Sequence, residues 1–77
     1  MDFSEAFTKL KKGLKLSRKG WNGKGLFVEA QYPDDNSKMG VPYLFIDAHV
    51  LGGTRAPWVP SQTDLFAEDW TVKIEVQ

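Results

Sequence analysis

The sequence contains no cysteine, so neither a disulfide nor a thiolate metal site can brace its 77 residues. It contains one histidine, His49, and a single histidine without cysteine does not make a zinc site. It also offers no nucleophile–base pair for covalent catalysis, which leaves the carboxylates of Asp64 and Glu68, four residues apart, as a catalytic alternative. We therefore expect a protein without metal, without cofactor and without enzymatic activity.

Net charge is also absent. Ten Lys and Arg residues balance ten Asp and Glu residues, and the pI is near 6.5, which argues against a dedicated DNA-binding protein. The charges are unevenly distributed: residues 1–24 carry seven basic and two acidic residues, whereas residues 60–77 carry one basic and four acidic residues. These two segments complement each other between subunits, form a local anion site, or are simply two solvated faces.

Long apolar runs are missing as well. No stretch approaches the ~20 apolar residues that a membrane span requires. The first residues, "MDFSEAFTKLKK", are amphipathic and contain acids, unlike a secretory signal. We expect the protein to stay in the cytoplasm where it is made, with no membrane partner.

Aromatic residues are plentiful: five Phe, three Trp and two Tyr. A chain of this length predicts a single domain, residues 1–77, which buries only roughly 60–65% of the surface that its unfolded form exposes. So many aromatic residues suit a dense core, but they also suit a surface for self-association. We therefore expect a homo-oligomer.

Hydrophobic spacing predicts an α+β fold, in which an antiparallel sheet of about five short strands carries an N-terminal helix. A short helical turn is expected near residues 61–68. The N-terminal helix is expected over residues 3–12, and the strands over residues 14–19, 26–32, 42–50, 54–59 and 70–77.

Capping and turn signals support these boundaries. Asp2 predicts the start of the first helix and Gly13 its end. Ser61 followed by Asp64 predicts the start of the second, short helix. The dipeptide Asn22-Gly23 favours a two-residue hairpin turn, because both positions of that turn require positive φ.

The three tryptophans have different sequence settings. Trp70 opens the last alternating strand in phase with apolar residues, which predicts a core residue. Trp58 lies between Pro57 and Pro60, outside any period, so it is either a stacking surface for a ligand or an anchor of a subunit interface. Trp21 lies at the predicted turn and must be covered by a loop, a partner subunit or a ligand.

Two polar segments are further candidates for binding. Gln62 and Thr63 have no evident structural duty at the start of the short helix, and a helix start favours anions. Gly20, Gly23 and Gly25 would allow backbone N–H groups to converge on an anion. Their spacing is not that of a P-loop.

Three segments of the chain together resemble a known family. "DFSEAFTKLKKGLKLSRKGWNGKG", "PYLFIDA" and "PWVPSQTDLFAEDWTV" resemble the second Thoeris anti-defence family, small phage-encoded proteins, over nearly the whole chain. The combination of "GWNGKG" with "PSQTDLFAEDW" is the most specific part of this resemblance.

The resemblance implies a sponge rather than an enzyme. Such a protein binds cyclic ADP-ribose-type signals (glyco-cyclic ADP-ribose isomers) made by Thoeris Toll/interleukin-receptor domain proteins, and holds them intact so that the effector is not activated. The resemblance also implies a homotetramer with pockets between protomers, acting in the cytoplasm of the infected bacterial host. Two alternatives follow from the same family: a sponge for cyclic dinucleotides, and a protein-interaction inhibitor of a bacterial defence nuclease, of the anti-CRISPR type.

In the sponge hypothesis a purine stacks on tryptophan or phenylalanine rings, polar side chains meet ribose hydroxyls, and cations with turn N–H groups meet phosphates. The expected ligand-binding residues are Arg18, Trp21, Asn22, Gly23, Lys24, Phe27, Trp58, Ser61, Gln62 and Asp64, and the family motif also marks Asp69. The loop "YPDDNSKMG", residues 32–40, has a composition that varies freely between small domains. If this loop borders the pocket, the choice of ligand stays open.

Overall fold

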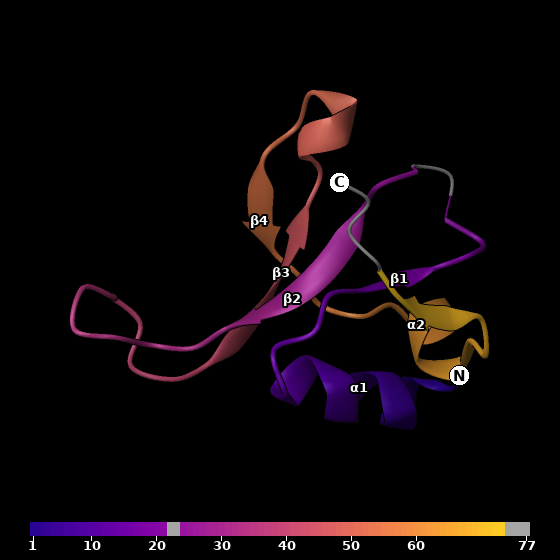
Figure 1. Cartoon of the computed structure of the whole chain (residues 1–77), viewed down its shortest axis with the longest axis horizontal. Helices are drawn as coiled ribbons and strands as arrows, with labels where there is room; N and C mark the ends of the chain where they lie inside the picture. Colours follow the sequence, from indigo (N-terminus) through magenta and orange to yellow (C-terminus); the bar gives the residue numbers. More distant parts are fainter. Residues whose placement is uncertain (22–23, 74–77) are drawn as a thin grey trace.

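The chain folds as one antiparallel sheet with helices against one face, the predicted α+β arrangement. The computed structural model describes residues 1–21 and 24–73. Within these ranges the sheet has five strands in the order β4-β3-β2-β1-β5 (Figure 1). The elements are α1 Phe3–Lys11, β1 Leu16–Arg18, β2 Phe27–Gln31, β3 Tyr43–Asp47, the 3-10 helix η1 His49–Leu51, β4 Arg55–Pro57, α2 Gln62–Phe66 and β5 Trp70–Val72.

The predicted helix boundaries are confirmed by their caps. The Asp2 side chain accepts a hydrogen bond from the backbone N–H of Glu5 at 2.9 Å, which starts α1. The chain leaves α1 through Gly13, whose φ of +91° is a conformation that suits glycine. At α2 both bonds of the capping box between Ser61 and Asp64 are present.

The core lies between α1 and the β2-β1-β5 half of the sheet. In the strand register Leu16 pairs with both Val28 and Val72, and Arg18 pairs with Trp70, so these side chains share one face. The buried cluster on this face consists of Ala6, Leu10, Leu16, Val28 and Trp70. Trp70 is only 2% exposed, which confirms it as a core residue.

The face opposite α1 carries no helix within the described residues, and cationic side chains cover its aromatic rings. Phe27 is 8% exposed, because the ammonium groups of Lys15 and Lys73 lie 4.9 Å and 4.4 Å from its ring centroid. Phe45 is 7% exposed, and the guanidinium of Arg55 lies 5.5 Å from its centroid. The alternation predicted for the second strand is confirmed, since Val28 faces α1 and Phe27 faces away.

Two strands end earlier than the sequence predicts. The strand expected over residues 42–50 ends at Asp47, because the Asp47 carboxylate accepts the backbone N–H of His49 and the chain turns into η1. Val50 is consequently 59% exposed instead of facing the core. The fourth strand ends at Pro57, which has no N–H for a sheet hydrogen bond.

Two predictions lie partly or wholly outside the described residues: the Asn22-Gly23 turn and the last strand beyond Lys73. The strands on either side, β1 and β2, are antiparallel neighbours, but β1 ends at Arg18 and β2 begins at Phe27, so the connection is longer than the predicted two-residue turn. None of the helices in residues 1–21 and 24–73 has the length and apolar character to cross a bilayer.

Replacing Leu16 with alanine should lower the free energy of unfolding by about 3 kcal/mol, because a fully buried side chain at the centre of the sheet leaves a cavity. Leu14→Ala is the matched control: the same truncation at a side chain that is 40% exposed should cost less than about 1 kcal/mol. Urea denaturation at one protein concentration, followed by tryptophan fluorescence, measures both. Equal losses at the two positions would contradict this placement of the core.

Candidate functional site

The three tryptophans form one cluster beside α2. The ring centroids of Trp21 and Trp70 are 5.4 Å apart, those of Trp58 and Trp70 are 6.0 Å apart, and those of Trp21 and Trp58 are 6.4 Å apart. All three pairs are edge-to-face, an arrangement that aromatic rings favour. Trp21 and Trp58 are half-buried against the core. The structure therefore brings the two predicted stacking residues together and packs both of them against the core.

Arg18 connects β1 to two acidic residues near the C-terminal end of the described chain. Its Nε donates to Oδ1 of Asp69, and its Nη1 donates to Oδ1 of Asp64, both at 2.8 Å. These hydrogen bonds, first that to Asp69, raise the pKa of Arg18 above its ordinary value. Two nitrogens of the guanidinium are thus committed to carboxylates, a structural duty that its phosphate-binding prediction did not include.

Asp64 is 8% exposed and belongs to the fold as much as to any site. Burial acts to raise its pKa, but hydrogen bonds from Ser61 and Arg18 outweigh burial and leave the pKa of Asp64 below its ordinary value. The Trp21 side chain also acts to lower the pKa of Asp64. A general acid needs a pKa near the working pH, so the lowered value argues against the alternative in which Asp64 and Glu68 form a catalytic pair.

The remaining predicted residues are distributed around this cluster or lie outside the description. Ser61 and Gln62 are exposed at the start of α2, and Lys24 is exposed in the β1–β2 connection. The Ser61 and Thr63 hydroxyls are 2.9 Å apart, so Thr63 supports the cap as well. Asn22-Gly23 lies outside the described residues.

A hollow of about 320 Å³ lies beside Trp58. Its lining is almost entirely apolar and consists of Met39, Tyr43, Leu44, Pro57, Trp58 and Val59. Of these residues the sequence predicted only Trp58 as a binding residue. The others come from separate segments that the fold brings together, so no single periodic pattern marks them. The loop over residues 32–40, which projects from the sheet in Figure 1, does border this hollow through Met39.

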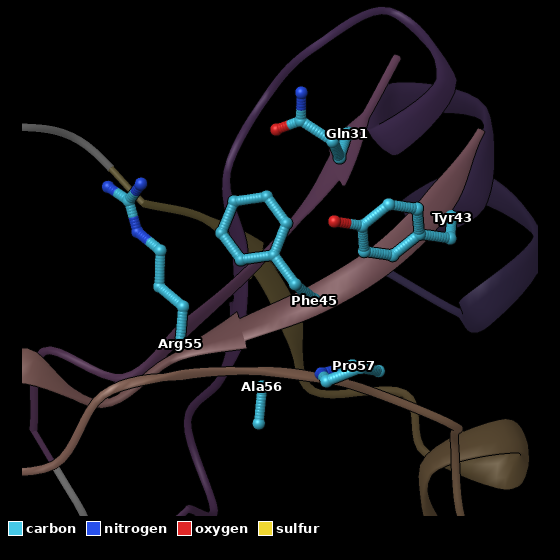
Figure 2. Close-up of a pocket in the computed structure, with 6 residues that line it drawn as sticks. All are labelled: Gln31, Tyr43, Phe45, Arg55, Ala56 and Pro57. Atoms are coloured by element: carbon cyan, nitrogen blue, oxygen red, sulfur yellow. The ribbon is translucent and has the colours of Figure 1, made fainter. Parts of the chain in front are cut away.

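Phe27 does not join the tryptophan cluster. It lies on the opposite face of the sheet, in register with Asp47 of β3. That open face has a separate hollow of about 230 Å³, shown in Figure 2, where Arg55 and Tyr43 flank the ring of Phe45. The predicted binding residues therefore divide between two faces of the sheet.

On the open face, the Asp47 carboxylate contacts both Arg55 and His49. Asp47 is 5% exposed; its Oδ2 accepts from Nε of Arg55 at 2.9 Å, and its Oδ1 lies 3.0 Å from both the backbone N and Nδ1 of His49. The Arg55 hydrogen bond, followed by the backbone hydrogen bond of His49, lowers the pKa of Asp47 from 3.8 to about 2. In residues 1–21 and 24–73, no three acidic or histidine side chains gather into a group that could hold a metal ion.

The fold and site define a small α+β domain in which a cluster of three tryptophans lies beside an arginine paired with two carboxylates. A family model described as the Thoeris anti-defense 2-like domain matches residues 1–73. Thoeris anti-defense 2 of Bacillus phage SP01 is 37% identical to this chain over an alignment of length 83, which covers 94% of this chain and 93% of the relative. The chain therefore belongs to the Thoeris anti-defense 2-like family, as the sequence motifs predicted.

Replacing Asp47 with asparagine should reduce the dependence of stability on acid pH. Because its pKa is about 2 in the folded chain and about 3.9 unfolded, ionised Asp47 adds stability above about pH 4, and this is lost as the pH falls towards 2. Asp47→Asn should thus be less stable than wild type near neutral pH, with a difference that shrinks in acid.

Urea midpoints measured between about pH 6 and pH 2.5 test this sign. Asp35→Asn, a change in the exposed β2–β3 loop, is the control and should follow the wild type throughout. A difference between Asp47→Asn and wild type that grows in acid would contradict the assignment.

Proposed function

We propose that this protein is a phage anti-defence protein that binds cyclic ADP-ribose-type signals, holds them uncleaved and so prevents activation of the Thoeris effector. It acts in the cytoplasm of the infected bacterium. The observation that carries the proposal is the pair of half-buried tryptophans, Trp21 and Trp58, beside an apolar hollow of about 320 Å³. Membership of the Thoeris anti-defense 2-like family supports the biological role.

The chemistry of this surface suits such a ligand. A purine ring stacks on Trp58 within the apolar hollow, where stacking on an aromatic side chain is worth about 1–3 kcal/mol. Gln62 at the exposed start of α2 and Asn22 provide amides for ribose hydroxyls. Lys24 meets the phosphates, whereas the backbone N–H of Gly20, which the sequence suggested as an anion ligand, donates to Oδ2 of Asp69 instead.

Sequestration needs no reacting group. The carboxylate nearest to the tryptophans, Asp64, has a lowered pKa and is occupied by Arg18 and by its own helix cap. It is held as an ionised acceptor and not as a proton donor. We propose that the signal is bound and released in its original, uncleaved form.

An assembly of protomers completes the binding pocket in this proposal. Phe27 and the tryptophan cluster lie on opposite faces of the sheet, so a ligand that contacts both must lie between two copies of the chain. Large apolar side chains are also exposed for so short a chain, with Val59 84% and Phe66 82% exposed. We propose the homotetramer implied by the family resemblance, with ligand pockets between protomers.

Trp58→Ala should weaken binding of a glyco-cyclic ADP-ribose isomer by about 10- to 100-fold, because one stacking contact is lost. Isothermal titration calorimetry measures the affinity, and Trp58→Phe, which keeps an aromatic ring at the same position, is the control and should lose much less of it. Mass spectrometry of the ligand released by heating should return it intact. Cleaved product, or no binding by wild type at micromolar concentration, would overturn the proposal.

Light scattering on the purified protein should give about four times the 8.7 kDa chain mass at micromolar concentration. A monomer mass under these conditions would contradict the intersubunit pocket. Cyclic dinucleotides titrated in parallel test the second sponge hypothesis. Pull-down of a defence nuclease in the absence of nucleotide tests the protein-interaction hypothesis.

A further inference from the structure

Asp69 lies immediately before β5, and its carboxylate contacts the chain on both sides of Lys19. Oδ1 accepts from Nε of Arg18 at 2.8 Å, and Oδ2 accepts from the backbone N–H of Gly20 at 2.8 Å. The backbone carbonyl of Asp69 also accepts the N–H of Lys19 at 3.2 Å. One residue from the C-terminal part of the chain therefore binds three successive residues at the start of the β1–β2 connection.

Gly20 fits this arrangement because it has no side chain. A Cβ atom at this position would lie 2.8 Å from Oδ2 of Asp69, closer than van der Waals contact allows. Any other residue would push the carboxylate away from the Gly20 N–H. The requirement for glycine here is one of space, and it is specific to the contact with Asp69.

Trp21 follows directly on this anchored turn. Its backbone N–H donates to the carbonyl of Arg18 at 3.2 Å, which closes the turn, and its ring packs against Trp70 and Trp58. Asp69 binds the backbone N–H groups of Lys19 and Gly20, the two residues before Trp21, so the position of the Trp21 ring depends on Asp69. Removal of Asp69 would free the turn and leave the indole held by its ring contacts with Trp58 and Trp70.

We propose that Asp69 is a positioning residue for ligand binding: it fixes the Gly20 turn so that Trp21 is already in place when the ligand arrives. This inference rests on the proposed function, in which the ligand binds beside Trp21 and Trp58. A surface that is fixed before binding loses less conformational freedom when the ligand arrives. Loss of Asp69 should therefore weaken binding and slow association, while the core of Leu16, Val28 and Trp70 stays formed.

The test uses protein labelled with 5-fluorotryptophan, in which the three tryptophans give separate fluorine NMR signals that are assigned by single Trp→Phe changes. Asp69→Ala and Gly20→Ala should shift or broaden the Trp21 signal, while the methyl NMR signals of Leu16 and Val28 in the core stay in place. Asp69→Asn keeps an acceptor for the Gly20 N–H, so its spectrum should be closer to that of the wild type than the spectrum of Asp69→Ala is. Glu68→Ala, the same truncation of a neighbouring exposed acid, is the matched control and should resemble wild type.

Affinity for the glyco-cyclic ADP-ribose isomer should fall about tenfold or more in Asp69→Ala and Gly20→Ala, mainly through slower association. Wild-type affinity with a wild-type Trp21 signal in Asp69→Ala would overturn the proposal. So would an affinity loss accompanied by equal disturbance of the Leu16 and Val28 methyl signals, which would show a general loss of folding. If the wild-type protein binds no signal, the proposed function and with it the ligand role of Asp69 fall, and the fluorine spectra still show whether Asp69 holds Trp21.

Discussion

The guanidinium of Arg18 joins three parts of the chain that are far apart in sequence. Arg18 belongs to β1, Asp64 to α2 and Asp69 to the approach to β5, and both ion pairs have N–O distances of 2.8 Å. Taking charges out of water is costly, and such a group is favourable only when further hydrogen bonds satisfy the carboxylates. Ser61 supplies that bond to Asp64 and Gly20 supplies it to Asp69. The polar network is therefore closed, and it fixes the segments around it.

The tryptophan cluster depends on this network. Asp64 accepts the indole N–H of Trp70 through its backbone carbonyl at 3.0 Å, and the Trp21 ring packs edge-to-face on Trp70. A short chain has few residues with which to build a core, so the same large rings that fill the interior also reach the surface. Stability and the candidate binding surface are consequently coupled: a change in Trp58 or Trp21 affects both. The candidate binding surface around Trp21 and Trp58 is therefore continuous with the core.

Local signals in the sequence predicted the elements, and long-range contacts determined the site. The caps at Asp2 and Ser61 act within one helical turn, so sequence spacing reveals them. The pairing of Arg18 with Asp69 spans 51 positions, and nothing in the local pattern indicates it. Periodicity also separated Trp70 from Trp58, because it describes the face of a strand and not the contact between side chains of different segments. The early end of β3 has a similar cause, since a carboxylate that binds its own backbone competes with the strand.

The two faces of the sheet have different chemistry, and this difference bears on how so small a domain can retain a ligand. Slow dissociation is the kinetic requirement of a sponge, and it comes from burial of the ligand. The hollow beside Trp58 has a volume of about 320 Å³, at the lower end of the range for small-molecule sites and too small for a purine, two riboses and a pyrophosphate together. The opposite face offers aromatic rings under cations, Phe27 with Lys73 and Phe45 with Arg55. In the proposed function, a second protomer that brings such a face over the hollow would supply both the missing volume and positive charge for the phosphates.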